Sequence, residues 1–346
     1  MTGGLALLLT LVLSPPALQP LDLPLPPLGG FPFVQPPEID AGSWSLYAVE
    51  ESTELWSHDA DRQRALASVT KVMTALLVAE LADPSATVPI TATAQGTPIG
   101  YPDQPRVLEG DRWTVEELLD NMMVQSGNDA AVALAQHVAG SVEAFVALMN
   151  QRAAQLGMAD THFANPNGLD TDDHYSSARD LIRLGEAAMA NPLVARTVRI
   201  KAITFDPGTR APIPVHNTNR LLGTFPGILG IKTGDTLEAG QVLLSYLDTG
   251  HGHMLGVVMG STDHMGATAE LMAYALQTLG PRDYLMAPAA GTPLAAFLPD
   301  WLVTRLEAVG TLDTGLWAPD RRGTPRSLAV VDALRLLLPP VLGGEE

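Results

Sequence analysis

The chain has 346 residues, of which 46% are hydrophobic and 17% charged, so it can form a substantial core and disorder of the whole chain is excluded. Its 38 acidic and 20 basic side chains give a formal net charge of -18, which argues against nucleic acid or an anionic membrane surface as the main partner. The chain has no cysteine, which excludes disulfides, thiolate nucleophiles and cysteine-based metal sites.

The first 42 residues indicate export and a tether. Residues 5–13 (LALLLTLVL) form an apolar run of signal-peptide length that is too short to span a bilayer comfortably. We therefore expect a signal peptide over residues 1–18 and location in the periplasm or cell envelope, with a buried helix or a misassigned start of the chain as the alternatives. The prolines that follow predict an extended tether over residues 19–42.

The next segment begins with strands and continues with helices. Residues 43–50 (SWSLYAVE) alternate as a strand does, and residues 53–57 predict a second strand. Residues 67–81 place apolar side chains at helical spacing and predict a mostly buried helix. Thr114 begins another helix, with Glu117 as its capping-box partner.

The later part of the segment changes from helical to β-rich. Further helices are predicted over residues 129–138, 142–156 and 177–189. Strands are predicted over residues 230–233, 241–247 and 253–259, the last two as a hairpin, followed by a helix over residues 266–279. The sequence therefore predicts an α+β domain over residues 43–285. Strands from both ends form an antiparallel sheet flanked by helices, with a helical block inserted between them.

Residues 286–346 are rich in Pro, Leu and Ala and predict a C-terminal tail or a reduced appended unit. Within them, residues 327–338 (SLAVVDALRLLL) are apolar but carry Asp332 and Arg335, and the run is too short and too charged for a spanning helix. A helix packed on the domain is favoured. Weak membrane association through the tail is the alternative.

The strongest chemical signal is a serine and a lysine three residues apart. Ser68 and Lys71 stand at the start of a predicted helix and so share one face. A serine hydroxyl needs an adjacent base to become a nucleophile. Lys71 can be that base only if burial and a nearby cation, such as Lys232, lower its pKa. The alternative is a helix-capping serine and a surface lysine.

A second motif, Ser126-Gly127-Asn128, falls between two predicted helices. A tight turn there can direct short polar groups into a cleft. Ser126 is the candidate for relaying a proton between Lys71 and the leaving amine, and Asn128 for binding the backbone carbonyl of the substrate. The alternative is an ordinary turn in which Asp129 caps the next helix.

The third motif is Lys232-Thr233-Gly234, at the end of a predicted strand. A strand edge can accept an extended peptide as an added strand. Gly234 allows close backbone approach, and Lys232 and Thr233 suit a substrate carboxylate. The alternative is a polar strand end that leads into a turn.

Together these motifs resemble those of the D-alanyl-D-alanine carboxypeptidases, the low-molecular-mass penicillin-binding proteins. Longer segments carry the same resemblance: ASVTKVMTALL, QSGNDAAVALA, THFANPNGLD, HYSSARDL, NTNRLLG and GIKTGDTLEAG. The resemblance implies a transpeptidase/β-lactamase-like fold and an acyl-enzyme on Ser68 that water hydrolyses. It implies the terminal D-Ala of peptidoglycan stem peptides as substrate, β-lactams as inhibitors, and an oxyanion hole of the backbone N–H groups of Ser68 and Asp235.

Three features depart from the family pattern. Asp235 places a negatively charged side chain beside the site that is expected to bind the carboxylate of the substrate. The turn Ser261-Thr262-Asp263-His264 lacks the arginine that the family often carries there, which leaves Arg220 or Lys232 for the substrate carboxylate. The tail is short for the usual β-rich second domain.

Other functions of the same fold stay open. A serine β-lactamase would need a glutamate to activate the deacylating water, and Glu143 and Glu186 both fall on predicted helices. A DD-endopeptidase and a non-catalytic peptidoglycan-binding relative are further alternatives. Neither His251-Gly252-His253 nor Asp170, Asp172, Asp173 and His174 has metalloprotease spacing. We expect no metal or cofactor, with the first group on a hairpin tip and the second in a solvated loop.

Overall fold

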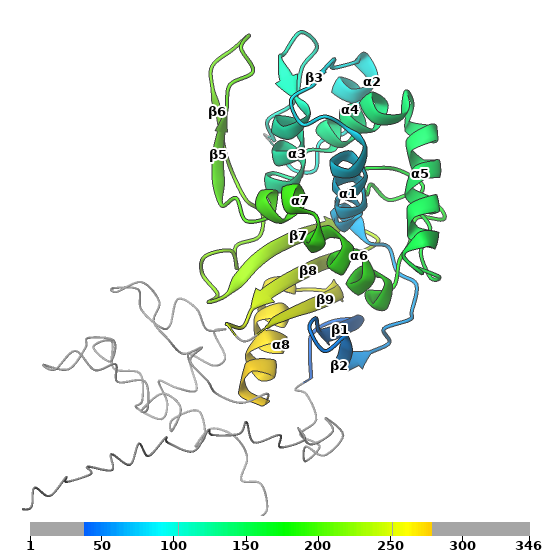
Figure 1. Cartoon of the computed structure of the whole chain (residues 1–346), viewed down its shortest axis with the longest axis vertical. Coiled ribbons are helices and arrows are strands. Elements are labelled where there is room, and N and C mark those ends of the chain that lie inside the picture. The colour runs from blue at the N-terminus through cyan, green and yellow to red at the C-terminus, as the bar shows by residue number, and fades with distance from the viewer. Residues whose placement is uncertain (1–37, 103, 251, 279–346) are drawn as a thin grey trace, which may run out of the picture. The chain divides into compact units, whose positions relative to one another are not determined.

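A computed structural model describes residues 38–278 except 103 and 251 (Figure 1). The expected signal peptide, most of the tether, His251 and the tail lie outside the described residues. Among the described helices, none alone is long and apolar enough to cross a membrane. The consecutive helices α4 (Asn128–Ala139) and α5 (Val142–Gln155), bent by 85°, meet that criterion only when they are taken as a pair.

A five-stranded antiparallel sheet in the order β2-β1-β9-β8-β7 organises the fold (Figure 1). Its strands are β1 (Ser43–Ala48), β2 (Thr53–His58), β7 (Ile228–Thr236), β8 (Gly240–Asp248) and β9 (His253–Ser261). Two strands come from the start of the domain and three from its end, and β1 pairs with β9 to join the two groups. The predicted α+β class, with strands contributed from both ends, is confirmed.

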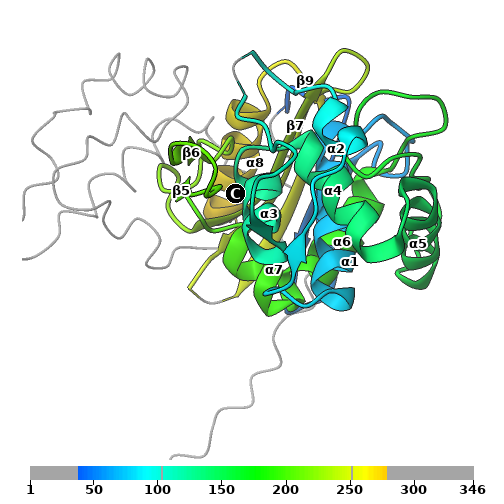
Figure 2. The same ribbon diagram turned by 90° about the horizontal axis from the view of Figure 1, so that it is seen from above.

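Helices cover both faces of the sheet, as Figures 1 and 2 show. A Cβ added to Gly185 of α6 (Ala178–Ala190) would lie 2.8 Å from Leu255 on β9. Gly256 follows Leu255 in β9, and a Cβ added to Gly256 would lie 2.4 Å from Met272 of α8 (His264–Thr278). Successive residues of a strand point to opposite faces, so α6 and α8 pack on opposite sides. This explains why β8 and β9 are almost continuously apolar.

The helical block lies between β2 and β7 in the chain. Its central helix, α1 (Lys71–Leu81), follows the short 3-10 helix η2 (Ala67–Thr70) and is surrounded by other helices. The other main helices are α3 (Val115–Val124), α4 (Asn128–Ala139) and α5 (Val142–Gln155). Residues on every side of α1 are buried, as expected for a helix without a polar stripe.

The long predicted elements are confirmed, and their ends have the expected chemistry. Thr114 accepts the backbone N–H of Glu117, whose carboxylate accepts the N–H of Thr114, so the predicted capping box starts α3. Ser177 caps α6 by accepting the N–H of Asp180 at 3.2 Å. Gly157, at φ +70°, follows the end of α5.

Six short elements were not predicted. They are β3 (Thr87–Val88), α2 (Ala92–Gly96), β4 (Trp113–Thr114), α7 (Pro192–Thr197), β5 (Ala202–Phe205) and β6 (Ile213–His216). The β5–β6 hairpin is held by contacts distant in sequence. Its Phe205 ring lies 5.5 Å from that of Trp113, and Arg210 forms an ion pair of 2.9 Å with the buried Asp111.

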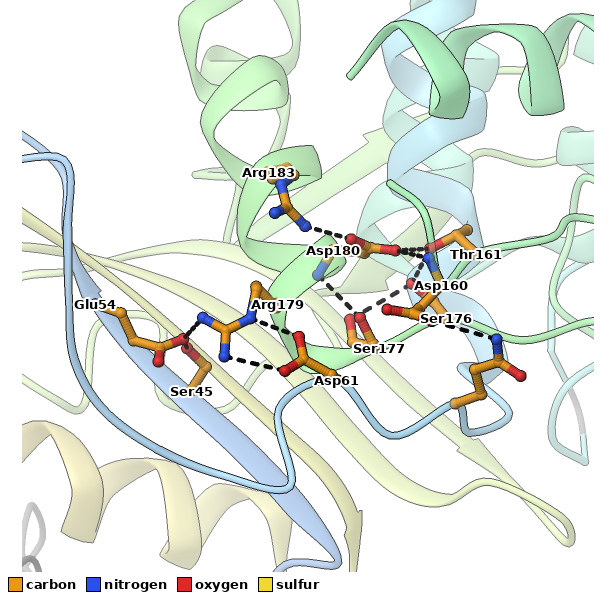
Figure 3. Close-up of polar contacts among 11 residues, drawn as sticks. Ser45, Glu54, Asp61, Asp160, Thr161, Ser176, Ser177, Arg179, Asp180 and Arg183 are labelled. Carbon is orange, nitrogen blue, oxygen red and sulfur yellow. Dashed lines mark hydrogen bonds and ion pairs between the residues drawn. The ribbon is translucent and has the colours of Figure 1, made fainter. Parts of the chain in front are cut away.

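Polar contacts fix the start of α6 against the sheet (Figure 3). Arg179 donates to Glu54 of β2 and to Asp61, at 2.6 Å in each case. The buried carboxylate of Asp180 accepts from the hydroxyl of Thr161 at 2.8 Å. These contacts position the segment that begins at Thr161 and that, as described below, reaches Lys71.

Candidate active site

The structure brings the three motifs together around Ser68 and Lys71. Ser68 lies in η2 and is half-buried, whereas the side chain of Lys71 is completely buried. Lys71 Nζ lies 2.8 Å from Ser68 Oγ, 2.7 Å from Asn128 Oδ1 and 2.5 Å from the carbonyl oxygen of Asn167. A neutral amine has two N–H groups and one lone pair. Because the two amide oxygens can only accept, they take both protons and leave the lone pair for the Ser68 hydroxyl.

The surroundings of Lys71 favour that neutral form. Burial holds the pKa of Lys71 well below its ordinary value, and the nearby charge of Lys232 lowers it further, while Asp129 opposes both. Asp129 lies in the first turn of α4, where it accepts the N–H of Ala130 and that of Val107, each at 2.9 Å. The charge of Lys232 thus lowers the pKa of Lys71, as the sequence led us to expect.

The turn between α3 and α4 carries the second motif. Ser126 is half-buried with a left-handed backbone at φ +66°, and its hydroxyl has no hydrogen-bond partner among the described residues. Asn128 is buried and makes two contacts, accepting from Lys71 and donating to the carbonyl oxygen of Pro98 at 2.9 Å. One amide N–H of Asn128 is left for a substrate carbonyl.

The third motif lies inside β7 and not at its end as predicted, because the strand continues to Thr236. β7 is the last strand of the sheet, so one of its edges has no neighbouring strand among the described residues. A Cβ on Gly234 would lie 3.0 Å from the backbone nitrogen of Ser68 and 2.8 Å from Ala67 Cβ. Glycine is needed here because β7 approaches the backbone of Ser68 this closely.

Lys232 and Thr233 are both buried at this edge. Lys232 Nζ donates to the carbonyl oxygen of Thr233 at 2.9 Å, and burial lowers the pKa of Lys232 to about 7. The hydroxyl of Thr233 lies 2.7 Å from that of Thr218, in the NTNRLLG segment. Lys232 thus contacts the backbone of Thr233, whereas the Thr233 hydroxyl contacts Thr218.

The side chain of Asp235 is exposed, unlike the buried residues before it in β7. Its charge acts on His264, whose ring Nδ1 lies 2.5 Å from Gln241 Oε1. Burial lowers the pKa of His264 and Asp235 raises it, while Arg220 and Lys232 contribute to lowering it. The region that lacks the family arginine thus holds a histidine among charges of both signs.

A loop over residues 165–168 completes the site. Pro166 accepts at its carbonyl from the Thr74 hydroxyl at 2.7 Å, and the next carbonyl, of Asn167, accepts from Lys71. Asn165 Oδ1 accepts the N–H of Gly168 at 2.6 Å and tightens the loop. Sequence reasoning found this segment through the resemblance but missed its contact with Lys71, because a backbone carbonyl leaves no residue-type signal.

Replacing Gly168 with alanine should destabilise the fold by about 2–4 kcal/mol, through left-handed strain and overlap together. Gly168 has φ +85°, and an added Cβ would lie 1.9 Å from the carbonyl oxygen of Ala67. Gly140→Ala is the matched control, since Gly140 has φ +79° but no atom within 4 Å of an added Cβ. Urea denaturation measures both free energies of unfolding, and equal losses in the two variants would contradict the close packing.

The described residues offer no glutamate in the place that a β-lactamase mechanism needs. Glu143 is exposed in the first turn of α5. Glu186 of α6 forms a hydrogen bond with the hydroxyl of Tyr47 and contributes to raising its pKa. The loop over residues 165–168 lies beside Lys71 instead.

Within the described part of the chain, no three His, Asp or Glu side chains gather as metal ligands. His253 pairs with Glu50 at 2.7 Å. Asp170, Asp172 and Asp173 are exposed, as expected of a solvated loop. His174 is not part of that solvated loop, because it is buried and makes two hydrogen bonds to other segments.

Residues 32–263 match the protein-family model described as D-alanyl-D-alanine carboxypeptidase. The chain belongs to this family. It is 35% identical to the D-alanyl-D-alanine carboxypeptidase DacD of Escherichia coli over 246 residues, which are 68% of this chain and 62% of that protein. It is 34% identical to DacF of Bacillus subtilis over 232 residues, 64% of this chain and 58% of that protein.

Solved structures agree with this membership. The crystal structure of a Streptomyces DD-transpeptidase aligns with a TM-score of 0.66 at 30% identity, and the alignment covers 70% of this chain and 100% of that one. The carboxypeptidase family fold is therefore present, and the predicted transpeptidase-like architecture is confirmed. The chain spans less than two thirds of the length of these curated carboxypeptidases.

Proposed function

We propose that this chain is a serine-type D-alanyl-D-alanine carboxypeptidase that removes the terminal D-Ala from peptidoglycan stem peptides. The observation that carries the proposal is the environment of Lys71. Its buried amine is held between two oxygens that only accept, with its lone pair left for Ser68. Measuring D-Ala released from a pentapeptide ending in D-Ala-D-Ala tests the proposal, and no release above that of a boiled sample would contradict it.

In the acylation step, Ser68 Oγ attacks the carbonyl carbon of the last peptide bond and its proton passes to Lys71 Nζ. The backbone N–H groups of Ser68 and Asp235 stabilise the oxyanion. Ser126 relays the proton to the leaving amine, the C–N bond breaks, and D-Ala departs. A water molecule then attacks the ester carbonyl while Lys71 takes its proton. The acyl–Oγ bond breaks, Lys71 returns the proton to Ser68 Oγ, and the shortened peptide leaves.

The substrate binds as an added strand along the open edge of β7. Gly234 allows its backbone close to the nucleophile, and the remaining N–H of Asn128 donates to a substrate carbonyl. Lys232 and Thr233 bind the terminal carboxylate. β-Lactams acylate Ser68 by the same route and act as inhibitors. Because stem peptides lie outside the cytoplasm, we infer action in the periplasm or cell envelope.

Replacing Lys232 with alanine should raise KM for peptides with a free terminal carboxylate about 10- to 100-fold, the effect of losing a charge-assisted hydrogen bond. Peptides with an amidated terminus should change much less. Lys201→Ala is the control, because Lys201 is an exposed lysine. Steady-state kinetics on matched acid and amide peptides measure this, and equal losses on both would contradict the carboxylate role.

The same assignment predicts a pH dependence of binding. With a pKa of about 7, the Lys232 side chain is charged below that pH and neutral above it. KM for carboxylate-ended peptides should therefore rise as pH increases through about 7. KM for amidated peptides should show no such rise.

A further inference from the structure

His174 is a buried titratable side chain that the proposed chemistry does not use. It follows the exposed Asp172 and Asp173, yet only 6% of its own surface is exposed. Both ring nitrogens have partners. Nδ1 accepts the backbone N–H of Ala164 at 2.9 Å, and Nε2 lies 2.8 Å from the hydroxyl oxygen of Thr70.

These partners fix the protonation state of the ring. The Thr70 hydroxyl donates its single proton to the carbonyl of Ala67 at 2.8 Å, so toward His174 it accepts from Nε2–H. Nδ1 accepts from Ala164 and therefore carries no proton. The network thus requires a neutral imidazole with its proton on Nε2, since a second proton on Nδ1 would face the N–H of Ala164.

The electrostatic surroundings agree with a neutral ring. Burial lowers the pKa of His174 to about 4, and a proton on His162 or Lys71 would lower it further. The charge of Asp170 opposes this lowering.

The ring connects the two sides of the catalytic geometry. Thr70 lies in η2, between Ser68 and Lys71 in the chain. On the other side, Ala164 immediately precedes the loop over residues 165–168, which presents the Asn167 carbonyl to Lys71. His174 is thus a direct bridge between the segment of the nucleophile and the segment that orients its base.

We propose that His174 is a positioning residue that, as a neutral Nε2–H imidazole, holds the Asn167 carbonyl on Lys71 and so keeps the lysine lone pair directed at Ser68. Its kinetic consequence rests on the proposed function, because it assumes acylation of Ser68. The hydrogen bonds of His174 go to Thr70 and Ala164 and not to Ser68 or Lys71.

Two substitutions at this position separate positioning from packing. His174→Leu fills the space without polar groups, whereas His174→Gln supplies one acceptor and one donor. His162→Gln, at an exposed neighbouring histidine, is the control. The leucine variant should lose at least 10-fold in kcat for D-Ala release and in the rate of penicillin acylation, with KM within twofold. The glutamine variant should recover most of that loss. Unchanged kcat in the leucine variant, or equal losses in both variants, would overturn the proposal.

A measurement without catalysis covers the case in which the leucine variant fails to fold. Nitrogen-15 NMR of the histidine rings in the wild-type protein should show His174 neutral, with its proton on Nε2, at pH 7 and still at pH 5. A cationic ring or a proton on Nδ1 at pH 7 would overturn the proposal. If the wild-type protein were not acylated by penicillin but gave the expected NMR signature, the proposed function would fail while the geometry of His174 would stand.

Discussion

Replacing Ser68 with alanine is expected to abolish penicillin acylation and to lower D-Ala release by roughly 10⁴-fold or more, as loss of a catalytic nucleophile does. Without Ser68 Oγ no acyl-enzyme can form, and no other hydroxyl lies within hydrogen-bond distance of Lys71 among the described residues. The fold should be retained, because the side chain is small and half-buried.

The measurement for this variant is labelling by a fluorescent penicillin together with D-Ala release from a pentapeptide. Ser57→Ala, at an exposed serine on β2, is the matched control and should behave as wild type. Labelling of the Ser68 variant at the wild-type rate would refute the assignment of the nucleophile. Thermal unfolding at a wild-type temperature would exclude loss of fold as the cause.

Replacing Lys71 with alanine is expected to slow acylation by about 10³-fold, within the range of a lost general base. The hydroxyl of Ser68 would keep its place but have no group to take its proton. Stability should also fall, because Asn128 Oδ1 and the Asn167 carbonyl lose their buried donor. Stopped-flow or gel-based acylation rates measure the first effect and chemical denaturation the second.

Lys71→Arg distinguishes the role of residue 71 as a base from its role as a hydrogen-bond donor. Arginine can donate to the same oxygens, but it keeps its proton at any working pH and has no lone pair for Ser68. We therefore expect Lys71→Arg to be as slow as Lys71→Ala in acylation. It should not regain the lost stability, because the burial and the Lys232 charge that lower the pKa of Lys71 also disfavour a fixed guanidinium charge. An arginine variant that is acylated at the wild-type rate would exclude Lys71 as the base.

The lowered pKa of Lys71 sets the direction of the pH dependence. A base must be neutral to act, so wild-type acylation should persist well below pH 10.5, the ordinary pKa of lysine, and fall only as pH decreases through the lowered value. Burial is the main cause of the lowering, and the charge of Lys232 adds to it. Lys232→Ala should therefore move this acid-side decrease to higher pH.

The long elements of the fold could be predicted because their periodicity and caps are local. The helix over α1 and the hairpin of β8 and β9 contain their own signals, as does the capping box of Thr114. The β5–β6 hairpin could not be found this way. Its stability comes from Asp111 and Trp113, about 100 positions away in the chain.

The site could be predicted as a set of motifs but not as a geometry. Ser68, Lys71 and Lys232 are recognisable from residue type and spacing. The contacts that tune them are not, because the Asn167 carbonyl and the Pro98 carbonyl are backbone atoms brought in from distant segments. The sequence places His174 next to exposed aspartates, and residue type alone does not show that its side chain is buried.

Mass spectrometry of the protein after brief exposure to penicillin, with peptide mapping of the adduct, tests directly whether Ser68 is the acylated residue. We expect one adduct per chain, on the peptide that contains Ser68, and release of a single D-Ala from a pentapeptide by the untreated protein. An adduct on another residue, or D-Ala release that persists after Ser68 is fully acylated, would contradict this expectation.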